Sequence, residues 1–166
     1  MKIVLCGFMG CGKSSIGRRL AKLIDYEFVD MDAFIENEEN MTVSEIFAQK
    51  GECVFRELET EAVIKLMGKE NVIIASGGGT VMNPINVEKI HEGGGKIYFL
   101  DVPLAALQER LKNDKRRPLL QKPDRRKVVE NLFNERYDKY LSASDVRIDA
   151  GAPAVWLAKQ MAKEII

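Results

Sequence analysis

The first residues able to do chemistry form the run Gly7-Phe8-Met9-Gly10-Cys11-Gly12-Lys13-Ser14. Its spacing matches the P-loop pattern G-x-x-x-x-G-K-[ST], in which backbone N–H groups surround phosphate oxygens. A short apolar run precedes the motif and a helical pattern follows it, which is the context it requires. The lysine of such a loop reaches the β- and γ-phosphates, and the hydroxyl ligates Mg²⁺. The sequence therefore predicts nucleoside triphosphate binding, with contacts from Gly10, Cys11, Gly12, Lys13, Ser14 and Ser15.

Two carboxylates stand at the end of the next apolar run, Asp30 and Asp32 in Phe28-Val29-Asp30-Met31-Asp32. Ligands of open α/β sheets bind outside the carboxyl ends of the strands, so both side chains are placed to face a cleft. One can support hydrated Mg²⁺, and the other can accept a hydrogen bond from an acceptor hydroxyl. The alternative is structural: Asp32 caps a helix and Asp30 is merely solvated.

A helical segment and a glycine run supply further candidates. In Phe55-Arg56-Glu57-Leu58-Glu59, Arg56 and Glu59 stand one turn apart, so the carboxylate can hold the guanidinium with its donor fork toward an anion. The alternative is an exposed surface ion pair. Gly77-Gly78-Gly79 follows an apolar run, where the backbone either approaches a ligand closely or forms a plain loop.

Arginines gather later in the chain. A basic stretch at 113–127 holds seven Lys and Arg residues, among them Arg116 and Arg117. Arg110 stands just before it. Phosphoryl transfer develops charge that arginines stabilise, and a flexible lid can bring them in after ATP binds. A solvated basic loop or an RNA-binding patch is the alternative. Arg136, in Glu135-Arg136-Tyr137, has an ordinary surface arginine as its alternative.

The charge balance narrows the classes of function. Lys and Arg number 25, and so do Asp and Glu, so no overall charge recruits nucleic acid or an anionic membrane. The three cysteines form no metal-ligand spacing with the single histidine, which indicates reduced thiols. No apolar run approaches the roughly 18 residues of a membrane span. We therefore expect a cytoplasmic protein that binds neither nucleic acid nor membrane.

Apolar strand patterns alternate with helical patterns along the chain. The strand patterns cover residues 3–6, 26–30, 72–75, 96–100 and 146–148, and the helical patterns cover 13–24, 42–51, 52–67 and 152–166. Continuous apolar strands indicate burial on both faces, which is typical of a parallel sheet between helices. A chain of 166 residues suits one such α/β domain.

Taken together, these motifs resemble those of the shikimate kinase family. The resemblance runs from Lys2 to about Ala152 and includes the P-loop, Asp30-Met31-Asp32, Phe55-Arg56-Glu57-Leu58-Glu59, Ser76-Gly77-Gly78-Gly79, Arg117-Pro118-Leu119-Leu120 and Arg136-Tyr137 with Tyr140. It implies a three-layer P-loop NTPase fold of the nucleoside monophosphate kinase-like type, with a five-stranded parallel sheet. Within a single kinase domain, residues 1–166, it implies a shikimate-binding helical region at about 31–60 and a lid at about 112–124.

The resemblance also implies an activity and its cofactors. Shikimate kinases transfer the γ-phosphoryl group of ATP, with Mg²⁺, to the 3-hydroxyl of shikimate in aromatic amino acid biosynthesis. The products are shikimate 3-phosphate and ADP. By resemblance, Lys13, Asp32 and Arg117 are catalytic, and Asp32 accepts hydrogen bonds from the shikimate hydroxyls and acts as base. Ser14 and Asp30 hold the metal.

The same resemblance assigns the binding residues. The shikimate site comprises Asp32, Phe47, Phe55, Arg56, Gly77, Gly78, Gly79 and Arg136, with both arginines on the carboxylate. Arg110 packs beside the adenine and Arg117 meets the phosphates, although the adjacent Arg116 leaves open which arginine does so. Cys11 stands where the family often has a small hydroxyl residue, and its backbone serves equally.

Two other functions compete with this interpretation. A gluconate kinase-like small-molecule kinase shares the P-loop, but it would not require Asp32, Arg56 and Arg136 together. A regulatory NTPase would use the basic stretch at 113–127 on RNA or a protein partner, which the zero net charge argues against. We expect a monomer whose partners are shikimate and ATP.

Overall fold

Five parallel strands form one sheet in the computed structural model, which describes residues 1–166 apart from the side chain of Pro118. Across the sheet the order is β2-β3-β1-β4-β5. The strands are β1 (Lys2–Cys6), β2 (Glu27–Asp30), β3 (Val72–Ala75), β4 (Gly95–Asp101) and β5 (Val146–Asp149). The chain places β2 and β3 on one side of β1 and then β4 and β5 on the other. A ligand crevice is expected at such a reversal, outside the carboxyl end of β1.

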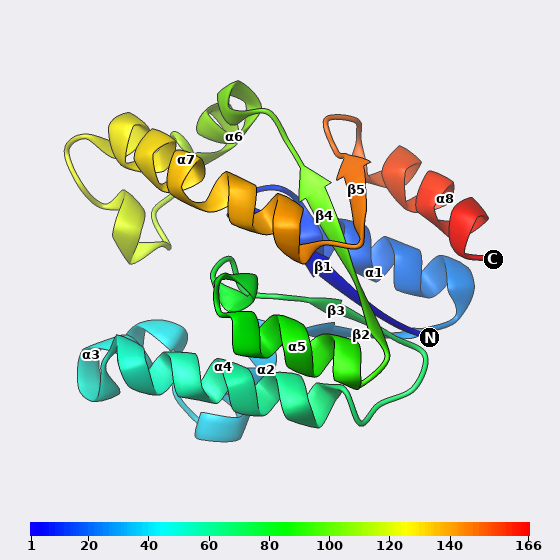
Figure 1. The fold of residues 1–166 in the computed structure, drawn as a ribbon. Helices are drawn as coiled ribbons and strands as arrows, with labels where there is room; N and C mark the ends of the chain where they lie inside the picture. Colours follow the sequence, from blue (N-terminus) through cyan, green and yellow to red (C-terminus); the bar gives the residue numbers. More distant parts are fainter.

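Helices cover both faces of this sheet (Figure 1). On one face α1 (Lys13–Ile24) packs against α8 (Ala154–Ile165), whereas α4 (Glu52–Leu66), α5 (Pro84–Glu92) and α7 (Arg125–Ala143) lie on the other. The remaining elements are α2 (Met31–Glu39), α3 (Val43–Lys50), α6 (Leu104–Leu111) and the short 3-10 helices η1 (Thr80–Met82) and η2 (Pro118–Leu120). The arrangement is the three-layer α/β fold predicted from the strand patterns.

The central strands are apolar on both faces because helices bury both. Residues Val72–Ala75 of β3 are all buried, and so are the last four residues of β1. Helix α1 turns Ile16, Leu20 and Ala21 toward the sheet. Gly17 lies between them, where a Cβ atom would stand 2.6 Å from the Phe28 ring. Glycine at this position allows the helix to approach β2.

Several element boundaries coincide with the sequence prediction. The predicted helix at 13–24 and the predicted strand at 72–75 match α1 and β3. Thr42 caps α3 as expected, since its hydroxyl accepts a 3.1 Å hydrogen bond from the Glu45 backbone N–H. Several other strand ends differ by one residue, as is usual where strands fray.

The sequence patterns did not predict α2 or α5. Helix α2 is short and mostly polar, and only Met31 and Ile35 on it are buried. Helix α5 begins at Pro84 after the Asn83 cap, a start signal that an apolar count overlooks. The basic stretch at 113–127 is also less irregular than expected, because α7 begins at Arg125.

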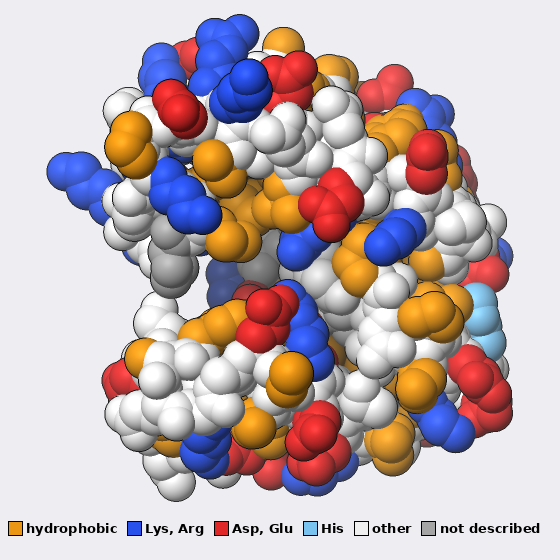
Figure 2. All heavy atoms as spheres, turned by 60° about the vertical axis from the view of Figure 1, so that its left-hand side comes forward, with side chains coloured by type: hydrophobic (Ala, Val, Ile, Leu, Met, Phe, Trp, Pro, Cys, Tyr) orange, Lys and Arg blue, Asp and Glu red, His pale blue; other side chains and the backbone are white. Residues whose placement is uncertain are grey.

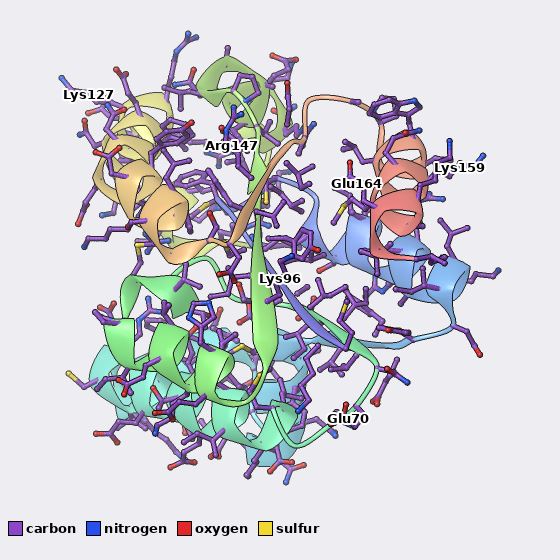
Figure 3. All side chains as sticks on the ribbon, turned by 45° about the vertical axis from the view of Figure 1, so that its right-hand side comes forward. Glu70, Lys96, Lys127, Arg147, Lys159 and Glu164 are labelled. Carbon is purple, nitrogen blue, oxygen red and sulfur yellow. The ribbon has the colours of Figure 1, made fainter. Side chains whose placement is uncertain are left out.

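The outer surface carries many charged side chains. Figure 3 shows Lys159 and Glu164 projecting from α8 and Lys127 from the start of α7. Within the part of the chain that the structure describes, no helix is both long and apolar enough to cross a membrane.

Candidate active site

The P-loop follows β1 and leads into the N-terminus of α1. Gly10 has φ 80° and Gly12, which caps α1, has φ 99°. A side chain would strain the backbone at both positions, so glycine allows the loop to curve around a phosphate. The 12-residue helix α1 begins at Lys13 and directs its free N–H groups toward the same place. The loop is therefore an anion site.

Lys13 rests on the backbone of its own loop. Its Nζ atom donates to the carbonyl oxygens of Gly7 at 2.7 Å and Phe8 at 3.2 Å. Arg110, predicted to lie beside the adenine, contacts the same loop: its Nη1 atom donates to the Gly10 carbonyl oxygen at 2.9 Å. Two cations thus lie at the predicted phosphate site. Cys11 is buried beneath the loop, and Ser15 is exposed on the first turn of α1.

Ser14 and Asp30, the predicted metal residues, contact each other. The Ser14 hydroxyl donates to Oδ2 of Asp30 at 2.7 Å. Oδ1 of Asp30 accepts from the Ala33 backbone N–H at 3.1 Å, so Asp30 is the N-cap of α2. The alternative that Asp32 caps this helix is wrong, because Asp32 is the second residue of α2. A hydroxyl and a carboxylate side by side are hard oxygen donors that fit Mg²⁺.

Asp32 is partly buried among other carboxylates. Burial, together with the negative charges of Asp30 and Glu59, raises the pKa of Asp32 from 3.8 to about 6, against the opposing charge of Lys13. Its Oδ1 atom lies beside Gly77, only 3.2 Å from where a Cβ of that glycine would stand. A carboxylate with a pKa in this range, next to a phosphate site, is suited to accept a proton.

Arg56 and Glu59 form a half-buried ion pair. Nη1 of Arg56 lies 2.5 Å from Oε1 of Glu59, and the Glu59 side chain is only 1% exposed. The alternative of an exposed surface pair is therefore wrong. The Arg56 guanidinium lies against Gly79, where an added Cβ would approach Nη1 to 2.6 Å. Glycine at this position makes room for the arginine.

Arg136 approaches the same glycine run from α7. Its Nη1 atom lies 3.3 Å from where a Cβ of Gly78 would stand. The Tyr140 hydroxyl donates to the Gly78 carbonyl oxygen, and burial raises the pKa of Tyr140, which keeps this donor protonated. A pocket of about 280 Å³ opens beside Arg56, Gly79 and Arg136. The two predicted anion-binding arginines are thus brought together, although they stand far apart in sequence.

Two aromatic residues stand beside this group. The Phe47 and Phe55 rings are 4.8 Å apart between centroids and tilted by 39°. Phe55 is buried, whereas Phe47 is 37% exposed. The Arg56 guanidinium carbon lies 5.5 Å from the Phe55 ring centroid. The aromatic pair thus joins α3 to the arginine on α4.

A second cluster fixes α7, and the sequence analysis missed it. Oδ2 of Asp101, at the end of β4, accepts from the Tyr137 hydroxyl at 2.7 Å and from Nε of Arg147 at 2.6 Å. Figure 3 labels Arg147 on β5, the strand beside β4. Tyr137 adjoins Arg136, so the cluster orients the helix that carries this predicted anion-binding arginine. The sequence contains a signal for Asp101, because this residue, like Asp30, stands at the end of an apolar strand.

The predicted lid contains its own ion pair. The Arg117 guanidinium contacts Oδ2 of Asp114, while Oδ1 accepts from the backbone N–H groups of Arg116 at 2.9 Å and Arg117 at 3.0 Å. Arg125, which follows the predicted lid, donates to the carbonyl oxygens of Leu111 just before it and of Lys112 and Leu120 within it. In this structure Arg117 is paired within its own segment.

Figure 2 shows a hollow between the upper and lower parts of the molecule, with Lys and Arg side chains on its walls. Comparisons with known proteins bear on the family of this chain. The family model described as "Shikimate kinase" matches residues 9–166. A shikimate kinase of Pelotomaculum thermopropionicum is 44% identical over 150 residues, which cover 90% of this chain and 86% of the relative.

The chain belongs to the shikimate kinase family. It is an ATP-dependent kinase that acts on shikimate and uses Mg²⁺. The fold agrees with this assignment. The solved shikimate kinase of Acinetobacter baumannii, in complex with shikimate, has a TM-score of 0.92 and 32% identity to this chain. The match covers 99% of this chain and 92% of that one.

The competing acceptor is not supported by the same comparison. A gluconokinase from Sinorhizobium meliloti has a TM-score of 0.54 and 17% identity, covering 99% of this chain and 94% of that one. Such a likeness reflects the shared fold alone. The shikimate kinase prediction is confirmed at the level of the family and its reaction.

Proposed function

We propose that this shikimate kinase holds its two substrates on opposite sides of Asp32. The P-loop residues, with Lys13 and Ser14, bind the ATP phosphates. The acceptor side consists of Gly77, Gly78, Gly79, Phe47, Phe55, Arg56 and Arg136. The observation that most supports this division is the convergence on the glycine run: Asp32 lies against Gly77, Arg136 against Gly78 and Arg56 against Gly79.

The chemistry of shikimate fits this convergence. Shikimate has one carboxylate and three hydroxyls. Arg56 and Arg136 supply two guanidinium groups for the carboxylate, whose two oxygens suit a bidentate fork. Asp32 and the carbonyl and N–H groups of the glycine run suit the hydroxyls. The Phe47 and Phe55 rings provide an apolar wall for the ring carbons.

Catalysis then follows from positioning and charge neutralisation. Asp32 accepts the proton of the 3-hydroxyl as that oxygen attacks the γ-phosphorus. Lys13 leaves the Gly7 and Phe8 carbonyl oxygens for the phosphates, and Arg117 leaves Asp114 to stabilise the transferring group. Ser14 and Asp30 would hold Mg²⁺, which neutralises phosphate charge when bound. Arg110, on the Gly10 carbonyl, stands at the edge of the nucleotide site.

The wider organisation is part of the same proposal. Residues 1–166 act as a single kinase domain, with a shikimate-binding region at about 31–60 and a lid at about 112–124. The enzyme is a cytoplasmic monomer without a nucleic-acid or membrane partner. The equal numbers of acidic and basic residues, 25 each, support the absence of nucleic-acid binding.

The acceptor assignment is tested with Arg56→Lys and a matched surface control, Arg19→Lys on the exposed face of α1. ADP release is coupled to a spectrophotometric readout, with and without shikimate. Because an ammonium cannot reproduce the bidentate fork, Arg56→Lys should raise the KM for shikimate at least tenfold, roughly 1.4 kcal/mol. The KM for ATP should stay constant. Equal shikimate KM values in Arg56→Lys and Arg19→Lys would refute the pocket.

A further inference from the structure

A ring of polar contacts begins and ends at Arg56. Its Nη1 atom donates to Oε1 of Glu59, whose Oε2 accepts from the Thr80 hydroxyl at 2.8 Å. The Thr80 carbonyl oxygen accepts from Nδ2 of Asn86 at 2.8 Å. Oδ1 of Asn86 accepts from the Thr60 hydroxyl at 2.7 Å, and that hydroxyl lies 3.3 Å from the Arg56 carbonyl oxygen. The ring thus joins α4, η1 and α5.

Three members of the ring are almost inaccessible to solvent. Thr80 is 0% exposed, and Glu59 and Asn86 are each 1% exposed. Thr60 is partly exposed, and Arg56 reaches outward with a side chain 32% exposed. A buried carboxylate needs a partner for each oxygen, because an unpaired one loses its hydration without compensation. Thr80 supplies the partner that leaves Oε1 of Glu59 for Arg56.

Thr80 also fixes the glycine run. Its backbone N–H donates to the Gly77 carbonyl oxygen at 3.3 Å, and its hydroxyl lies 3.1 Å from where a Cβ of Gly77 would stand. Thr80 therefore holds both the glycine turn that faces the acceptor and the Glu59 carboxylate that orients Arg56. Asn86 holds Thr80 from the far side.

We propose that Thr80 and Asn86 are positioning residues that set the Arg56 guanidinium for the acceptor carboxylate. The inference rests on the proposed function, in which Arg56 binds that carboxylate. Without the Thr80 hydroxyl, the Glu59 carboxylate turns to recover a partner for Oε2. Arg56 then loses its fixed acceptor, Oε1 of Glu59, and its alignment over Gly79. The effect is on recognition of the carboxylate, and the phosphate side of the site is unchanged.

The central test compares Thr80→Val, which removes the hydroxyl but keeps the shape, with Thr80→Ser, which keeps the hydroxyl. Thr80→Val should raise the KM for shikimate roughly tenfold, the scale of a lost buried hydrogen bond to a charged group. The KM for ATP should not change, and Thr80→Ser should recover most of the loss. A second acceptor, with a hydroxymethyl group in place of the carboxylate, should be used equally poorly by wild type and Thr80→Val.

A matched control separates positioning from general destabilisation. Asp145 lies before β5, at the opposite end of the sheet from the site, and its carboxylate accepts from the Ile97 backbone N–H at 2.7 Å. Asp145→Ala should lower Tm and leave both KM values unchanged. If Thr80→Val fails to fold, Thr60→Val opens the ring at its more exposed side and should raise the shikimate KM two- to threefold.

The possible outcomes test the acceptor pocket and the ring separately. A normal shikimate KM in Arg56→Lys means that the proposed pocket is wrong. A raised KM in Arg56→Lys with a normal KM in Thr80→Val or Thr60→Val overturns the ring while the pocket stands. A Thr80→Val enzyme that loses ATP and shikimate affinity alike, or loses as much on the hydroxymethyl acceptor, also overturns it, because its defect is then general.

Discussion

The Ser14 hydroxyl donates a 2.7 Å hydrogen bond to the Asp30 carboxylate, and this contact joins the P-loop to the carboxyl end of β2. The other oxygen of Asp30 caps α2, the helix on which Asp32 lies. The nucleotide site and the proposed base are therefore connected through one side chain. A change at Asp30 can act on metal binding, on the cap or on both, and two substitutions separate these effects.

We predict that Asp30→Asn weakens the response to Mg²⁺ without unfolding α2. Asparagine caps helices about as well as aspartate, so Tm should stay close to that of the wild type. Loss of the negative charge should raise the Mg²⁺ concentration for half-maximal activity roughly 10- to 100-fold, as for other residues that support a metal. Titration of initial rates with Mg²⁺ at saturating ATP and shikimate measures the shift.

Asp30→Ala is the control for the cap. It should show the same Mg²⁺ shift and, in addition, a loss of about 1 kcal/mol in the free energy of unfolding, because the Ala33 N–H loses its acceptor. If Asp30→Asn keeps the wild-type Mg²⁺ dependence, Asp30 has no role in metal binding and serves only as the cap of α2.

Much of the fold could be predicted from the sequence because its central strands are unusually uniform. The run Val72–Ala75 is buried on both faces, so its apolar pattern admits few other interpretations. Helix α2 escaped prediction because only Met31 and Ile35 on it are buried, which is too few to give a helical apolar pattern. Its start is marked by the Asp30 cap, and local apolar patterns report burial rather than capping.

The second prediction concerns the pH dependence of activity. Burial, with the charges of Asp30 and Glu59, raises the pKa of Asp32 to about 6, and only the ionised carboxylate can accept the proton of the acceptor hydroxyl. The value of kcat/KM for shikimate should therefore fall below about pH 6, by roughly tenfold for each further pH unit. Rates measured from pH 5 to 8 test this. A profile that stays flat down to pH 5 would exclude Asp32 as the base.

The third prediction concerns stability. The ionised Asp32 carboxylate is expected to lower the free energy of unfolding, whereas most aspartates that are paired in the fold raise it. The pKa of Asp32 is raised from 3.8 to about 6, so the folded protein disfavours the charged form. Above about pH 6 the ionised group destabilises the fold, and below about pH 3.8 this contribution disappears. Asp32→Asn should remove turnover, retain ATP binding and increase the free energy of unfolding at pH 7.5 by about 1–3 kcal/mol.

Thermal unfolding of Asp32→Asn and wild type at two pH values measures this effect. The variant should unfold about 2–12 °C higher at pH 7.5, and the difference should shrink toward pH 4 as the wild-type carboxyl becomes neutral. A variant less stable than wild type at pH 7.5 would show that Asp32 is stabilised by contacts that outweigh its burial.

The candidate site was predictable where a motif names its residues and unpredictable where the fold creates the contact. The P-loop and Asp32 follow from spacing and from the end of a strand. Asp101 and Tyr137 meet only because β4 and α7 pack together, and no local pattern joins residues so far apart. Thr80 is hidden for a related reason, since its role depends on Glu59 across η1 and α4.

The last prediction concerns Asp114 as the resting partner of the lid arginine. Burial opposes ionisation of Asp114, but the backbone N–H groups of Arg117 and Arg116 and the nearby guanidinium outweigh it and hold the pKa of Asp114 below its ordinary value. Asp114 therefore stays charged, and under the proposed mechanism it competes with phosphate for Arg117. Asp114→Asn should keep the backbone contacts while weakening that competition.

A partly exposed ion pair is worth about 1 kcal/mol or less, so the gain from Asp114→Asn should be modest, roughly two- to fivefold in kcat/KM for ATP. The same substitution in an Arg117→Ala background should have no effect, because the competing group is gone. Initial rates of wild type, both single variants and the double variant complete this cycle. If Asp114→Asn has the same effect with and without Arg117, the resting pair does not restrain Arg117. Another cation then neutralises the phosphates, and Arg116 is the next residue to replace.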